Sequence, residues 1–163
     1  MKKVAIPIQF TEFENISELS DQDRLLVEIA RKMTQNAYAP YSEFSVGTAV
    51  LLDNGEIVTG SNQENAAYPS GLCAERVATF SASANHPQAT MKTIAISANN
   101  KTQTMDYPVT PCGACRQVML EYETRQSEPI KVILSGNSGK IYILEQVKDL
   151  LPLTFTVDDL KRL

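Results

Sequence analysis

Apolar residues recur at helical spacing between residues 20 and 37. Ser20 can cap the start of this helix, with Asp23 at its third position as in a capping box, and Pro40 ends it. One face of the helix would then be buried along its whole length. The residues of this expected stripe are Leu25, Leu26, Ile29, Ala30, Met33 and Ala37.

Two apolar runs flank a turn signal farther along, which predicts a hairpin. The runs cover residues 44–52 and 56–61, and Asp53-Asn54-Gly55 lies between them. An Asn-Gly pair suits a tight turn because it tolerates positive backbone angles. Ahead of the first helix, residues 4–10 (VAIPIQF) predict a short strand, and their proline indicates an edge strand.

Strands and helices alternate in the second half of the chain. The expected elements are helices at 73–85 and 112–122, strands at 91–98, 130–135 and 141–144, and short tail helices at 145–150 and 157–162. Such alternation implies parallel strands joined by right-handed crossovers. We therefore expect an α/β fold, a three-layer α/β/α sandwich around a mixed sheet of about five strands.

No repeat or low-complexity linker divides the chain, so we expect one domain over residues 1–163. Residues 1–18 would be an N-terminal extension, either an added edge strand or a subunit contact. If the strands before the two long helices are parallel neighbours, both helices begin at the same edge of the sheet. Ligands of open α/β sheets bind there, beyond the carboxyl ends of the strands.

Composition narrows the class of protein. The chain has 163 residues, of which 43% are hydrophobic and 21% charged, as in soluble globular domains. Its net charge of −4 disfavours a nucleic-acid partner, which calls for a basic surface. No apolar run approaches the roughly 20 residues of a bilayer span, and the N-terminus lacks the pattern of a secretory signal. We therefore expect a cytoplasmic protein without a membrane partner.

The candidate chemistry lies in the cysteines. Cys73, Cys112 and Cys115 all fall at the starts of the two long helices, where thiolates are stabilised. Three converging thiolates suit zinc. The only histidine, His86, falls past the end of the helix expected at 73–85, so no fourth protein ligand is apparent. The fourth position on the metal would then be left to water, as in catalytic sites. The alternatives are a redox pair or half of a structural zinc site at Cys112 and Cys115, and a buried core thiol at Cys73.

Glu75 follows Cys73 by two residues, in the same helical turn. Its carboxylate can reach a zinc-bound water without binding the metal, although a solvated first-turn acid is the plainer interpretation. A Cys-x-Glu followed by Pro-Cys-x-x-Cys, here LCAER and PCGACRQ, is the zinc signature of nucleobase deaminases.

With these motifs the chain resembles the cytidine deaminase family in its short, three-cysteine, homotetrameric form. The resemblance runs from about residue 38 to residue 160 and includes AYAPYSEFSVGTAVL, SNQENAAYPSGLCAER and DLLPLTFTVDDL. It implies one Zn²⁺ per subunit, a small nucleoside substrate and a homotetramer whose subunits share sites. The implied reaction is hydrolytic deamination of cytidine and 2′-deoxycytidine to uridine and 2′-deoxyuridine with release of ammonia, as in pyrimidine salvage. Glu75 would be the catalytic proton shuttle.

The resemblance also implies a sugar-binding segment. The family residues that match Asn62 and Glu64 hydrogen-bond the ribose, chiefly its 3′-hydroxyl, and Asn65 completes the same motif. Ala66 and Tyr68 match positions in the same nucleoside-contacting segment. An amide and a carboxylate on alternate residues point the same way and can donate to and accept from one hydroxyl. An ordinary polar loop is the plainer interpretation.

Four further residues take roles from the resemblance. Phe44 matches the family residue beside the base, and Phe155 matches the one that stacks on it from a neighbouring subunit, a contact of about 1–3 kcal/mol. Arg76 matches an arginine that hydrogen-bonds zinc-bound thiolates, and Gln117 would support the same surroundings. The plainer interpretations are two core aromatics and an exposed helix arginine. Ser61 stands where the family often has a cysteine, and we expect no loss of function from this difference.

Three other functions share part of this pattern. A deaminase of a cytosine-containing antibiotic such as blasticidin would use the same zinc motifs, but the sugar-binding segment favours a plain nucleoside. A polynucleotide deaminase would need a basic groove. A zinc-stabilised binding module without catalysis would have no need for Glu75. The sequence does not separate a preference for ribose from one for deoxyribose.

Overall fold

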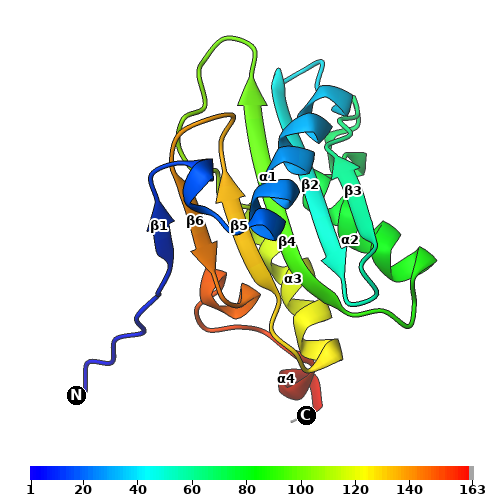
Figure 1. Cartoon of the computed structure of the whole chain (residues 1–163). Helices are drawn as coiled ribbons and strands as arrows, with labels where there is room; N and C mark the ends of the chain where they lie inside the picture. The colour runs from blue at the N-terminus through cyan, green and yellow to red at the C-terminus, as the bar shows by residue number, and fades with distance from the viewer. Residues whose placement is uncertain (162–163) are drawn as a thin grey trace.

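The computed structural model describes residues 1–161, which build a six-stranded mixed sheet with helices on both faces (Figure 1). The strand order is β1-β6-β5-β4-β2-β3. The strands are β1 (Thr11–Phe13), β2 (Phe44–Leu52), β3 (Ile57–Ser61), β4 (Met91–Asn100), β5 (Lys131–Ser135) and β6 (Ile141–Leu144). The helices are α1 (Asp21–Met33), α2 (Ala74–Asn85), α3 (Gly113–Gln126) and α4 (Val157–Lys161), and 3₁₀ turns include η2 (Thr34–Asn36), η3 (Tyr68–Ser70) and η4 (Val147–Leu150).

The sheet is buried on both faces, which confirms the three-layer α/β/α class. Helix α1 covers one face, where Ala30 packs in a cluster with Ala95 of β4. Helices α2 and α3 cover the other face, where Ala78 and Met119 pack in a second cluster with Ile94 (Figure 1). The sheet has six strands rather than about five, because the N-terminal β1 adds to one edge. No helix within residues 1–161 is long and apolar enough to cross a membrane.

The two long helices on the second face begin at the same edge of the sheet. Strands β4 and β5 are parallel neighbours joined through α3. The strands before α2 and α3 are not neighbours, because the hairpin places β2 between β3 and β4. Since β2 is antiparallel to both of them, β3 and β4 still run in the same direction. Their carboxyl ends therefore lead toward the same edge.

The buried face of α1 is rotated from the expected stripe. Leu25 is 49% exposed, whereas Val27 is fully buried. The buried face of α1 consists of Asp23, Leu26, Val27 and Ala30. Asp23 belongs to it because its carboxylate forms an ion pair with Lys131 of β5 at 2.5 Å. The capping role of Ser20 is confirmed, because its hydroxyl accepts a hydrogen bond from the Asp23 amide.

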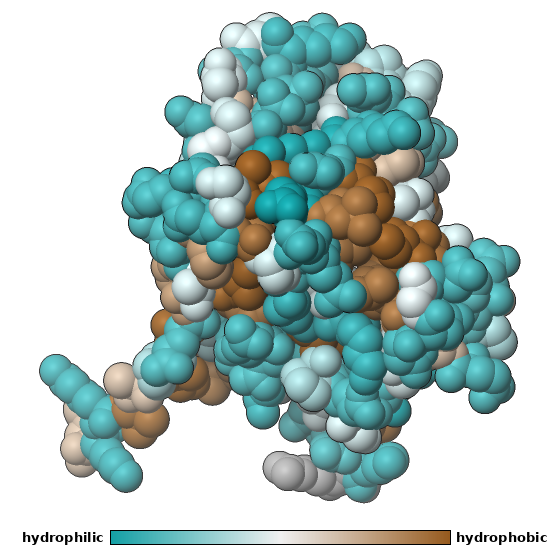
Figure 2. Space-filling model, in the orientation of Figure 1, coloured by the Kyte–Doolittle hydropathy of each residue, from teal (hydrophilic) through white to brown (hydrophobic). Residues whose placement is uncertain are grey.

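The N-terminal segment does not form a strand over residues 4–10, so that prediction is wrong. The strand begins at Thr11, which pairs with Ile143 of β6. Because β6 ends at Leu144, the preceding residues have run past the end of their partner strand. Figures 1 and 2 show this segment projecting away from the body of the molecule.

The remaining boundaries lie close to the expected ones. Helix α3 continues to Gln126, four residues beyond the expected end, and β4 continues to Asn100. The tail contains the two short elements expected there, and residue 162 of the second lies outside the described residues. The hairpin is confirmed, with Gly55 at a φ of +87° as its one positive backbone angle within the turn. The Leu52 amide closes this turn on the carbonyl oxygen of Glu56 at 2.9 Å.

Gly60 of β3 lets α2 lie directly on the sheet. A Cβ atom at this position would be 2.5 Å from the Ala74 carbonyl oxygen and 2.6 Å from the Ala78 nitrogen. These are backbone atoms of α2, so they cannot move aside as the end of a flexible side chain could. Gly60 therefore sets the depth at which the first turn of α2 rests on β3.

We expect Gly60→Ala to destabilise the protein by about 1–3 kcal/mol, because the added methyl group pushes the first turn of α2 off the sheet. Gly113→Ala is the matched control, since a Cβ there meets nothing within 4 Å and alanine favours the helix that begins at this residue. Urea unfolding of both variants measures the difference. Equal midpoints for Gly60→Ala and the unaltered chain would contradict the packing argument.

Candidate functional site

Three thiols meet where α2 and α3 begin. Cys73 is the residue that precedes α2, Cys112 precedes α3, and Cys115 lies in the first turn of α3. The three sulfur atoms lie within 4.8 Å of one another, and those of Cys112 and Cys115 are 3.5 Å apart. Neither Cys73 nor Cys112 forms a capping hydrogen bond to its own helix through its side chain. The expected convergence of the three cysteines is therefore present.

The cluster fits a zinc ion. Sulfur atoms that share one tetrahedral zinc are separated by about 3.8 Å, given Zn–S bonds of about 2.3 Å. The separation of the Cys112 and Cys115 sulfur atoms, 3.5 Å, is close to this spacing, and Cys73 lies within 4.8 Å of both. Thiolates are also the soft donors that select zinc. Three protein ligands leave one position for water, which favours a catalytic site over a closed structural one.

The surroundings of the thiols shift their pKa values in opposite directions. The neighbouring Cys115 thiol lowers the pKa of Cys73 to about 5, with Arg76 acting in the same direction against the effect of burial. The neighbouring Cys73 and burial raise the pKa of Cys115. Because the thiolate is the form that binds a metal, zinc binding must release any protons that the thiols still carry.

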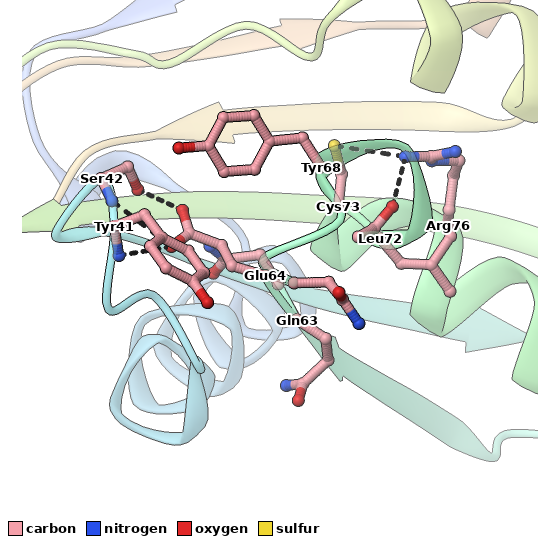
Figure 3. Close-up of a pocket in the computed structure, with 11 residues that line it drawn as sticks. Tyr41, Ser42, Gln63, Glu64, Tyr68, Leu72, Cys73 and Arg76 are labelled. Atoms are coloured by element: carbon pink, nitrogen blue, oxygen red, sulfur yellow. Dashed lines mark hydrogen bonds between the residues drawn. The ribbon is translucent and has the colours of Figure 1, made fainter.

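Arg76 supplies the positive charge beside the sulfur atoms. Its Nη2 lies 3.9 Å from the Cys73 sulfur and 3.4 Å from the carbonyl oxygen of Gly71 (Figure 3). The side chain is partly buried, which argues against a plain exposed helix arginine. Zinc with three thiolates carries a net charge of −1, and a guanidinium ion offsets that excess.

Glu75 is buried rather than solvated. It lies in the first turn of α2, is 4% exposed, and its Oε2 atom has no hydrogen-bond partner within the described chain. Burial raises the pKa of this carboxyl, and the neighbouring charge of Cys73 adds to the effect. An unsatisfied buried carboxyl is expensive to maintain, so its place beside the thiols points to a chemical role.

Asn62 fixes the start of β2. Its side-chain oxygen accepts a hydrogen bond from the Val46 amide at 2.7 Å, and its side-chain nitrogen donates to the carbonyl oxygen of Phe44 at 2.9 Å. Asn62 is buried, and Phe44 is half-buried at the first position of β2. The predicted sugar contact therefore also serves as a brace for the strand that presents Phe44.

Glu64 holds the loop before β2 in the same manner. Its carboxylate accepts from the Tyr41 amide at 2.9 Å and from the amide and hydroxyl of Ser42. These hydrogen bonds, led by that of the Ser42 hydroxyl, lower the pKa of Glu64. Sequence reasoning missed Tyr41 and Ser42, because their contacts with Glu64 span more than twenty residues and leave no local signal.

A groove of about 480 Å³ opens between this loop and the start of α2 (Figure 3). Tyr41 and Tyr68 face each other across the groove edge to face, with ring centroids 5.9 Å apart. Residues that were expected to bind substrate or support the metal make up much of the lining. These are Asn62, Glu64, Asn65, Tyr68, Cys73 and Arg76.

Several expected contacts lie outside the lining of this groove. Phe44, Ala66 and Phe155 do not line it, and Phe155 is 56% exposed in the tail. The Gln117 side chain donates to the carbonyl oxygen of Phe155 at 2.9 Å and makes no hydrogen bond to a thiol in the described structure. Gln117 thus contacts the tail rather than the sulfur atoms that it was expected to support.

Comparison with known proteins places these features in a family. Residues 20–128 match the family model described as the cytidine and deoxycytidylate deaminase zinc-binding region. A cytidine deaminase of Halalkalibacterium halodurans is 39% identical over 84% of this chain and 96% of its own length. One of Sporosarcina psychrophila is 40% identical over 86% and 95%. The crystal structure of cytidine deaminase from Burkholderia pseudomallei, 36% identical, matches with a TM-score of 0.71 and covers 84% of this chain and 100% of that one.

From the thiol cluster we expect one zinc ion per chain. Cys115→Ser should weaken zinc binding by more than about tenfold, because it removes a ligand rather than a neighbouring support. Arg125→Gln, which changes an exposed residue near the far end of α3, is the control. Elemental analysis after dialysis against a weak chelator measures the bound metal. Full occupancy in Cys115→Ser would show that the three thiols do not form the site.

Proposed function

The chain belongs to the cytidine and deoxycytidylate deaminase family, and on this premise we propose that it deaminates cytidine and 2′-deoxycytidine hydrolytically. The products would be uridine or 2′-deoxyuridine and ammonia, as pyrimidine salvage requires. The relatives named above are cytidine deaminases at 39% and 40% identity over most of both chains, which supports this reaction class.

Buried Glu75 beside the thiol cluster is the observation that carries the proposal. A site that only stabilised the fold would need the three sulfur ligands and no proton carrier. Glu75 has one oxygen without a hydrogen-bond partner, and burial raises its pKa, so it binds a proton more readily than an ordinary carboxyl does, as a proton carrier requires. Deamination of cytosine needs such a carrier, because one water proton must move to ring N3 and the other must move to the leaving nitrogen.

Cys73, Cys112 and Cys115 would hold the zinc ion. When bound, zinc supplies a Lewis acid that lowers the pKa of water toward neutrality. Arg76 would keep the sulfur ligands from donating too much negative charge to the metal, since it lies against Cys73.

Glu75 would act at two stages of the reaction. It first accepts a proton from the attacking water and delivers it to ring N3, while the water oxygen bonds to C4. It then moves the second water proton to the exocyclic amine, the C4–N bond breaks, and ammonia leaves. One water is consumed, and the product retains a hydrogen at N3 and a carbonyl at C4. The backbone around Thr110 and Pro111, just ahead of Cys112, would meet the amine.

The nucleoside would lie in and beside the groove. Asn62, Glu64 and Asn65 would bind the sugar, with Ala66 and Tyr68 in the same segment. The braces that Asn62 and Glu64 already make to the loop before β2 support this assignment, because they hold both side chains in fixed orientations.

The base would be flanked by two aromatic residues. Phe44 would lie beside it, and Phe155 would stack on it from a neighbouring subunit of a homotetramer. Phe155 is 56% exposed within its own chain, so it is free to contact another subunit.

Glu75→Gln should keep the fold and the zinc ion but lose turnover of cytidine by about 10²–10⁴-fold, because an amide cannot carry the proton. Glu121→Gln, an exposed carboxyl on α3, is the control and should retain turnover. Absorbance loss of cytidine, with uridine identified by chromatography, measures the rate in zinc-loaded protein. Turnover retained by Glu75→Gln would refute the assigned role. Conversion of blasticidin but not cytidine would redirect the proposal to the antibiotic.

The sugar contact can be tested with a substrate that lacks the 3′-hydroxyl. Glu64→Gln should raise KM for cytidine by about 10-fold or more, because a charged acceptor is lost. The same change should alter KM for 3′-deoxycytidine much less, since that hydroxyl is absent. Glu56→Gln in the hairpin turn is the control. Equal effects on both substrates would assign Glu64 to the loop alone.

A further inference from the structure

Side chains of α3 hold the 3₁₀ turn η4 at both of its ends. At the start of the turn, the Glu123 carboxylate accepts hydrogen bonds from the amides of Val147 at 2.7 Å and Lys148 at 3.0 Å. At its end, Nη1 of Arg116 donates to the carbonyl oxygen of Leu150 at 2.7 Å. Arg116 and Glu123 are two helical turns apart and so share one face of α3. The negatively charged Glu123 therefore binds the free amides at the start of η4, and the positively charged Arg116 binds the free carbonyl at its end.

Arg116 also bonds the segment that leads into the thiol cluster. Its Nε donates to the carbonyl oxygen of Pro111 at 2.8 Å, and Pro111 immediately precedes Cys112. One guanidinium group therefore links two carbonyls, one in the tail and one beside a zinc ligand. The planar, rigid arrangement of its donors allows this, whereas a lysine ammonium would not span both in the same geometry.

The tail is tied to α3 a second time, at Phe155. Gln117, the residue after Arg116, donates to the Phe155 carbonyl oxygen at 2.9 Å. Between the two ties, Leu153 has a φ of +57° and is 88% exposed. A leucine in the left-handed region is strained, and an exposed one gains no packing energy in return. The bonds on either side must therefore hold the path of this segment.

We propose that Arg116 is a positioning residue that couples the tail carrying Phe155 to the Pro111–Cys112 segment of the metal site. Movement of either segment would break a bond to the same guanidinium group. The kinetic part of the inference rests on the proposed deamination, whereas its effect on metal retention does not. Loss of Arg116 should therefore disturb two properties at once, the retention of zinc and the binding of substrate.

The test compares three substitutions in the zinc-loaded, full-length protein. Arg116→Gln should release zinc to a chelator about 10-fold faster, the scale of losing a residue that orients a ligand, and should raise KM for cytidine by a similar factor. Gln117→Ala, which cuts only the tie at Phe155, should raise KM and leave zinc release unchanged. Arg125→Gln, on the same helix but outside both ties, should change neither quantity.

A chemical rescue separates positioning from loss of fold. In Arg116→Ala, millimolar guanidinium ion should recover part of the KM and slow the release of zinc, whereas methylammonium should recover neither. The proposal would be overturned if guanidinium ion gave no rescue. It would also be overturned if Arg116→Gln released zinc at the same rate as the unaltered chain and had the same KM. If the unaltered holoprotein does not turn over cytidine, the proposed function fails alone, and the comparison of zinc release still decides on Arg116.

Discussion

Three thiols and a buried carboxyl gather where two helices begin at one edge of a shared sheet, and their surroundings determine the site. The thiols of Cys73, Cys112 and Cys115 lie within 4.8 Å of one another, a distance that three thiolates would oppose by repulsion. A cation bound by all three sulfur atoms would offset that repulsion, and Arg76 places a positive group against Cys73. Glu75 is kept out of water in the first turn of α2, so its proton affinity rises.

Helix α3 unites parts of the chain that are distant in sequence. Its first turn presents Cys115, its next residues bond the tail, and Glu123 farther along holds the start of η4. On the edge strand β3, the close approach at Gly60 fixes the height of α2 above the sheet. These contacts set the positions of the two helix starts at which the thiols lie.

Features that depend on residues close in sequence could be predicted, whereas those that depend on distant contacts could not. The pairing of Cys112 with Cys115 was predicted because residues three apart in a helix are neighbours. Cys73 and Glu75 were joined to them by the combined motif and by the expectation that both helices begin at one edge of the sheet. The phase of α1 was missed at Leu25, since the inward turn of that helix depends on a pairing with β5 that lies more than a hundred residues away. Arg116 was missed for the same reason, because its bond to Leu150 leaves no periodic signal in the sequence.

The short strand β1 covers the edge of the sheet that β6 would otherwise expose. It pairs with β6 over three residues, and Lys140 beside that edge forms an ion pair with Glu12 of β1 at 2.6 Å. An uncovered β6 would offer a row of free amides and carbonyls to any extended chain, a common route to aggregation. The matched family region begins only at residue 20, so this protective strand lies upstream of it. A chain shortened to the family region would expose the free side of β6 along the three residues that β1 now pairs, and so would offer other strands a place to bind.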